Sequence, residues 1–110
     1  MLFRSVLDDG QDRLAPLDAL LRSGHPVTAA VTVDRGLVYW TPAQGPWRYR
    51  GPALGGHYVC LVHVDTRGDY VAVGSWGSDY GEAGLHRIAR DEIASRRTSY
   101  LATPVIVRMP

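Results

Sequence analysis

Lysine and asparagine are both absent from this sequence of 110 residues, and all 12 basic residues are arginine. The codons of the two missing residues are rich in A and T. Their joint absence is therefore typical of a gene with high G+C content, as in a high-GC bacterium or its phages. The lack of asparagine also has a chemical consequence, because no asparagine amide in this chain can hold a histidine ring in a fixed orientation.

Cysteine is almost absent as well, since Cys60 is the only one. A lone cysteine cannot form an internal disulfide, so nothing in the sequence indicates an oxidising compartment. The first ten residues lack the basic flank and apolar run of a signal peptide, and no run approaches the roughly 18 apolar residues of a membrane span. The net charge of +1 gives no general attraction to nucleic acid or membrane. We therefore predict a protein that is neither secreted nor bound to a membrane.

The composition is that of one globular domain spanning residues 1–110. Apolar residues make up 45% of the chain and charged residues 21%, as in ordinary soluble domains. A chain of this length buries about two thirds of its surface on folding, which suffices for a core. Residues 1–13 are polar, and we predict that they form an irregular N-terminal arm.

The periodicity of apolar residues predicts one helix followed by five or six strands. A helix is expected over 16–22, and a strand over 27–33, where apolar and polar residues alternate. The most apolar strand, 57–64, is expected at the centre of the sheet. Residues 65–69 form a hairpin turn in which Gly68 takes a positive φ. Shorter elements are expected at 37–40 (strand), 70–74 (strand), 85–89 (strand), 91–95 (helical turn) and 104–108 (strand). The predicted fold class is α+β: a small, coiled antiparallel sheet or half-barrel with one N-terminal helix packed on it.

Two glycine-rich motifs stand out. Gly55-Gly56-His57 places a histidine at the start of the apolar strand, and Gly74-Ser75-Trp76-Gly77 begins a loop that continues through Tyr80 to Gly84. With the order of the other elements, and with Gly24-His25-Pro26-Val27 after the helix, they resemble the histidine-bearing, C-terminal half of papain-like cysteine peptidases. The related C39-like peptidases share the Gly-Gly-His strand and the following hairpin, so the resemblance leaves open which of the two it is. The resemblance extends from about residue 14 to residue 108.

The resemblance implies a role for several residues. His57 matches the general base of the family, Gly74 lies where the family has the asparagine that orients this base, and Trp76 matches the tryptophan that shields the pair from water. The family's helical lobe, with the nucleophilic cysteine, has no counterpart in these 110 residues. Asp79 is a weaker alternative for orienting His57.

The one cysteine is not placed to act as a nucleophile. Cys60 is three positions from His57 on one strand, and an odd offset puts the two side chains on opposite faces of the sheet. His63 shares the face of His57 but is six residues away, and neither His25 nor His86 has the spacing of a metal ligand. We therefore predict no metal site and no cofactor.

The tetrapeptide Trp47-Arg48-Tyr49-Arg50 is the one cluster of basic and aromatic residues. It suits an exposed loop that contacts another protein, with stacking on single-stranded nucleic acid as the weaker alternative. The arginines at 87, 90, 96 and 97 alternate with Asp91 and Glu92, a pattern typical of a solvated charged face.

The leading hypothesis is a non-catalytic papain-like domain, a pseudoenzyme that acts as a structural or protein-binding subunit of a larger assembly. Without a covering lobe, aromatic surface around Tyr58, Trp76 and Tyr80, with Trp47, would be open to a second protein or to another copy of the chain. The expected location is the cytoplasm or a phage particle, where the chain would be a virion component. The alternative is the histidine-bearing subunit of a split cysteine peptidase or amidase, in which another chain supplies the cysteine and His57 is the catalytic base.

Overall fold

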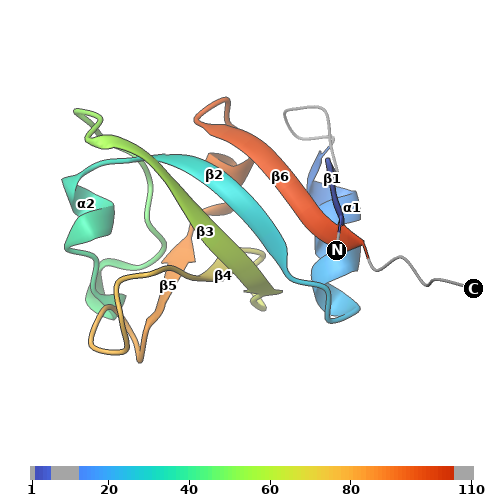
Figure 1. Cartoon of the computed structure of the whole chain (residues 1–110). Coiled ribbons are helices and arrows are strands. Elements are labelled where there is room, and N and C mark those ends of the chain that lie inside the picture. Colours follow the sequence, from blue (N-terminus) through green and yellow to red (C-terminus); the bar gives the residue numbers. More distant parts are fainter. Residues whose placement is uncertain (1, 6–12, 106–110) are drawn as a thin grey trace, which may run out of the picture.

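The computed structural model describes residues 2–5 and 13–105. Its centre is a six-stranded, strongly twisted sheet in the order β1-β6-β2-β3-β4-β5, in which every neighbouring pair is antiparallel (Figure 1). The strands are β1 (Leu2–Ser5), β2 (Val27–Val33), β3 (Gly55–Val64), β4 (Tyr70–Val73), β5 (Leu85–Ile88) and β6 (Thr98–Val105). The predicted α+β class and the central position of β3 are confirmed.

Three short helices and one turn of 3-10 helix accompany the sheet: α1 (Leu14–Arg22), α2 (Arg35–Val38), α3 (Arg90–Ala94) and η2 (Pro42–Gln44). Helices α1 and α2 lie at opposite ends of the sheet (Figure 1), and α1 contacts β2 and β3. The predicted N-terminal helix and the turn at Asp91 are confirmed within two residues. No described helix is long and apolar enough to cross a membrane.

The core forms where α1 meets one face of the sheet. Strand β2 alternates between buried and half-buried residues along its whole length, as its sequence pattern predicts. Its buried side chains pack against the apolar stripe of α1 and against β3, in a cluster that includes Leu14, Leu17, Leu21, Val27, Ala29, Val31, Val59 and Leu61. The opposite side of β3 is more open than its apolar composition predicts, because Tyr58 and Val62 are exposed there.

The segment predicted to be an irregular arm contains regular structure. Residues 2–5 form β1, which pairs with β6, while residues 6–12 lie outside the described part of the chain. At the end of this segment, Arg13 is buried and donates hydrogen bonds to the carbonyl oxygens of Ile93 and Thr98. Arg13 therefore joins the start of α1 to α3 and β6.

Two further predicted elements are corrected by the structure. The expected strand at 37–40 is helical, because the Asp34 carboxylate accepts a hydrogen bond from the Leu37 amide and caps α2. The last strand begins at Thr98, earlier than the predicted 104–108, and pairs with both β1 and β2. Hydrogen bonding to a strand on each side stabilises β6, even where apolar and polar residues do not alternate clearly in its sequence.

Two buried carboxylates hold the loops against this framework. Asp34 accepts hydrogen bonds from the amides of Leu37, Arg50 and Gly51 and from the Trp47 indole. Burial alone would raise the pKa of Asp34, but these donors outweigh it and the pKa is lowered. Asp18 likewise accepts from Arg90 and Tyr70.

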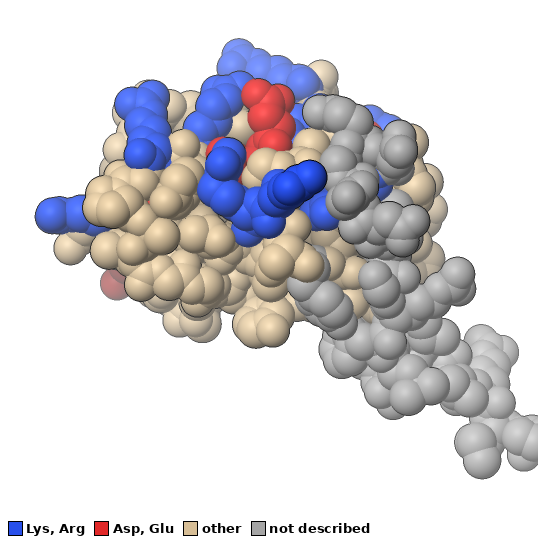
Figure 2. Space-filling view, turned by 90° about the horizontal axis from the view of Figure 1, so that it is seen from above, with Lys and Arg blue, Asp and Glu red and all other residues tan. Residues whose placement is uncertain are grey.

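The arginine-rich segment 87–97 is more than a solvated face. Arg90 pairs with Asp18 at 2.8 Å, and Arg97 pairs with the buried Glu92 at 2.9 Å. Figure 2 shows arginine side chains spread across the upper part of the view, with few carboxylates among them. The prediction of a merely solvated face is therefore wrong for Glu92, which is buried, and for Arg90, which joins α3 to α1, whereas Arg97 is exposed as predicted.

Candidate functional site

The site is built around His57, the third residue of β3. His57 pairs with Val31 of β2, so its backbone is fixed inside the sheet. Its ring stacks on the indole of Trp76, with centroids 4.6 Å apart and planes 5° apart. The structure therefore brings together the histidine and the tryptophan that the two glycine-rich motifs single out.

The loop that carries Trp76 needs its glycines. Gly77, Gly81 and Gly84 have positive φ angles of 90°, 61° and 88°, which side chains disfavour. A Cβ on Gly81 would also overlap the carbonyl oxygen of Leu85. This tight path brings Tyr80 edge-on to Trp76, with centroids 4.8 Å apart, and the Tyr80 hydroxyl donates to the carbonyl of Leu37. Burial raises the pKa of Tyr80 to about 12.

Gly74 lies directly beside the inner nitrogen of His57. The His57 Nε2 atom is buried and has no hydrogen-bond partner among the described residues. A Cβ built on Gly74 would lie 3.7 Å from this nitrogen. The position at which the resemblance implies an orienting asparagine therefore lies beside the His57 ring, but in this chain it is a glycine and has no side chain to hold that ring.

His86 completes the site, and the sequence reasoning missed it. This residue of β5 pairs across the sheet with Ala72 of β4 and has no exposed surface. Its ring lies 5.5 Å from that of Tyr80 and 6.2 Å from that of Trp76, and neither ring nitrogen has a partner among the described residues. Burial, followed by the charge of His57, lowers the pKa of His86 to about 4. The alternation of His86 and Ile88 on β5 was the available signal that this ring points inward.

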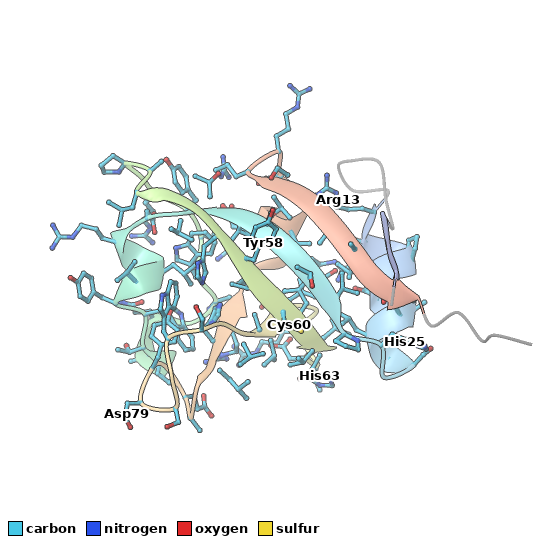
Figure 3. The ribbon with its side chains drawn as sticks, viewed as in Figure 1. Arg13, His25, Tyr58, Cys60, His63 and Asp79 are labelled. Atoms are coloured by element: carbon cyan, nitrogen blue, oxygen red, sulfur yellow. The ribbon has the colours of Figure 1, made fainter. Side chains whose placement is uncertain are left out.

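Cys60 lies on the other face of β3, as the parity argument predicts. Along β3, Val59 and Leu61 are buried, whereas Tyr58 is exposed and Cys60 is partly exposed (Figure 3). Burial raises the pKa of the Cys60 thiol. The cysteine is therefore neither directed at His57 nor activated as a thiolate.

The other predicted site residues are dispersed. Tyr58 is 67% exposed, whereas Trp76 and Tyr80 are half-buried beside His57. The prediction for Trp47 is wrong, because this residue is 4% exposed and its indole donates to Asp34 at 2.9 Å. Trp47 is a core residue whose ring anchors the loop after η2.

The remaining polar candidates also lie away from His57. Asp79 is exposed at the outer loop (Figure 3) and has no hydrogen bond to His57 in the described structure. A β-bulge between Leu61 and His63 leaves His63 exposed while the next residue turns inward, so the predicted shared face of His57 and His63 is wrong. Within residues 2–5 and 13–105 there is no group of three or more metal-ligating side chains.

Comparisons with known proteins agree on the fold. Cathepsin B-like CP3 of Giardia intestinalis is 35% identical over 89 residues, which is 77% of this chain and 29% of that protein. Procathepsin L 3 from the larval midgut of Tenebrio molitor superposes with a TM-score of 0.68 at 18% identity, covering 94% of this chain and 34% of that one. The bromelain protease of Ananas comosus, solved with the E64 inhibitor, superposes with a TM-score of 0.70 at 19% identity, covering 96% and 50%. No model of a known protein family matches the chain.

The fold is thus that of the papain-like cysteine peptidases. The chain is similar in sequence to this cathepsin B-like protein and in fold to these papain-like enzymes, and it spans about a third to a half of their length. The resemblance expected from the glycine-rich motifs is confirmed at the level of the fold and of sequence similarity.

Proposed function

We propose that this polypeptide is a non-catalytic papain-like domain, equivalent to the histidine-bearing half of the peptidases, and that it works as a protein-binding subunit of a larger assembly. One observation carries the proposal. The only thiol of the 110 residues, Cys60, lies on the face of β3 opposite to His57. Acyl transfer by a thiol requires a thiolate within hydrogen-bond reach of the imidazole, together with a group that fixes the ring. The described residues offer neither arrangement.

Exposed aromatic surface supports a binding role. Tyr58 is 67% exposed on the face of β3 opposite to His57. On the other face, the partly exposed Trp76 stacks on His57. Tyrosine and tryptophan are favoured anchors at protein interfaces because they bury a large rigid surface at little entropic cost. We propose that a partner protein, or a second copy of the chain, docks over Tyr58 on the face of β3 opposite to His57.

The test combines an activity assay with a binding measurement. We expect the purified chain to hydrolyse neither peptide nor peptidoglycan substrates, and light scattering over a range of concentrations to reveal self-association. Tyr58→Ser should weaken this association, whereas Tyr39→Ser, at an equally exposed tyrosine (66%), should not. A stable monomer that cleaves either substrate would overturn the proposal.

A second candidate is favoured by the geometry of His57 itself. The stack of His57 on Trp76 and the position of Gly74 beside Nε2 support this candidate, because they match the arrangement that the resemblance implies for a catalytic histidine. The chain would then be one subunit of a split cysteine peptidase or amidase, and another polypeptide would supply the thiolate. In that case His57→Ala abolishes hydrolysis by the reconstituted pair and Cys60→Ala does not. Activity that survives His57→Ala would refute this candidate.

A further inference from the structure

Two imidazole rings border Gly74, and three of their buried nitrogens have no protein partner among the described residues. They are Nε2 of His57 and both ring nitrogens of His86. Buried polar atoms in native proteins are nearly always hydrogen-bonded, to protein or to ordered water. Unpartnered nitrogens on two neighbouring rings therefore point to a bound molecule that pairs with one nitrogen of each ring.

The backbone of Gly74 leaves the room for this molecule. A Cβ at this position would lie 3.7 Å from His57 Nε2, 3.8 Å from His86 Cε1 and 4.0 Å from Trp76 Cε3. These are ordinary contact distances, so a side chain fits where none is present. Because both imidazoles border this one point, a single small molecule can reach them together.

The surroundings define the chemistry of that molecule. The rings of Trp76, Tyr80 and Trp40 enclose His86, and the hydroxyl of Tyr80 and the indole N–H of Trp40 already donate to the carbonyls of Leu37 and Gly45. A neutral imidazole offers one N–H donor and one acceptor nitrogen. The matching ligand is small and neutral, and it both donates and accepts.

We propose that an ordered water molecule binds beside the Cα of Gly74 and links His57 Nε2 to His86, so that His86 acts as a positioning residue for His57. A buried water typically makes two to four hydrogen bonds, which the two rings can supply. The aromatic enclosure keeps bulk solvent from competing. This water can bind whether or not His57 takes part in catalysis, so the stability and NMR tests below are independent of the activity and binding tests of the proposed function.

The first experiment uses two substitutions at Gly74 and a control at Gly56. Neither glycine has a positive φ. The loss of backbone entropy in the unfolded state would therefore make alanine at either position slightly stabilising if nothing else changed. At Gly56 the space is open, and we expect Gly56→Ala to leave the Tm unchanged or raise it. At Gly74 the added methyl group displaces the water and leaves the imidazoles unpaired, so Gly74→Ala should lower the Tm. Gly74→Asn supplies an amide in its place and should melt above Gly74→Ala.

The second experiment detects the link directly in the wild-type chain. Nitrogen-15 NMR of the histidine side chains should reveal a slowly exchanging imidazole N–H at this site and cross-peaks to a long-lived water. In His86→Phe the His57 nitrogen shifts should move toward those of an unrestrained imidazole. A rise in Tm for Gly74→Ala, no higher Tm for Gly74→Asn than for Gly74→Ala, or His57 shifts unchanged in His86→Phe would each overturn the proposal.

Discussion

The stability of the domain should fall on mild acidification because of His86. This ring has no exposed surface, and its pKa is lowered to about 4 in the folded protein. In the unfolded chain it returns to the ordinary value of about 6.5. Between these two values the unfolded state binds more protons than the folded state, so lowering the pH favours unfolding.

The size of the effect follows from the difference between the two pKa values. Each pKa unit corresponds to about 1.4 kcal/mol. Integrated from neutral pH, the loss of unfolding free energy is about 2 kcal/mol at about pH 5, about 3 kcal/mol at about pH 4, and levels off near 3.5 kcal/mol at lower pH. This is a large share of the 5–15 kcal/mol that typically stabilises a domain.

Urea denaturation monitored by tryptophan fluorescence, at several values of pH from about 8 to 5, measures this loss. His86→Phe keeps an aromatic ring in the enclosure and removes the titrating group, so its free energy of unfolding should hardly change over the same range. His63→Gln, at an exposed histidine, should behave like the wild type. The lowered pKa values of Asp18 and Asp34 contribute only as the pH falls through them, below this range. Equal slopes for the wild type and His86→Phe would refute the reasoning.

Three other substitutions or reactions probe the framework. Asp34→Ala should lower the free energy of unfolding by at least about 3 kcal/mol, because it leaves several buried N–H donors unpaired. Chemical denaturation measures this loss, and Asp79→Ala, at an exposed carboxylate, should leave the free energy of unfolding almost unchanged. Gly81→Ala should lower the free energy of unfolding by more than about 1 kcal/mol in the same assay, since Gly81 has a φ of 61° and a Cβ there would overlap the carbonyl of Leu85. A more stable variant would contradict the described path of this loop. Cys60 should react with iodoacetamide more slowly at neutral pH than free cysteine does, because burial raises its pKa; faster labelling would mean that the thiol is activated.

The regular parts of the sheet could be predicted because the alternation of apolar and polar residues in the sequence matches the alternation of buried and half-buried residues in the structure. Val27 to Val33 alternate in sequence and in burial, and the glycine at position 68 takes the positive φ expected of its turn. The opposite orientations of His57 and Cys60 also followed from strand parity alone. These features depend on geometry within one strand or one turn.

The features that could not be predicted depend on contacts across the chain. Trp47 reads as an exposed loop residue, but it is buried because Asp34, thirteen positions earlier, accepts its indole N–H. The alternation of β5 places His86 on the inward face, but its complete burial results from the loop that folds Trp76 and Tyr80 over it. The same holds for β6, whose bounds are set by pairing with β1 and β2.

The isolated position of Cys60 has a practical consequence. A chain with a single sulfhydryl accepts one fluorophore or spin label at a known place, without further mutagenesis. Because that place is on the far side of β3 from His57 and Trp76, the attached reporter would leave the imidazole pocket intact. Cys60 is two residues from Tyr58 on the same face of β3, so a change in the signal of such a label would report the docking of a protein over Tyr58.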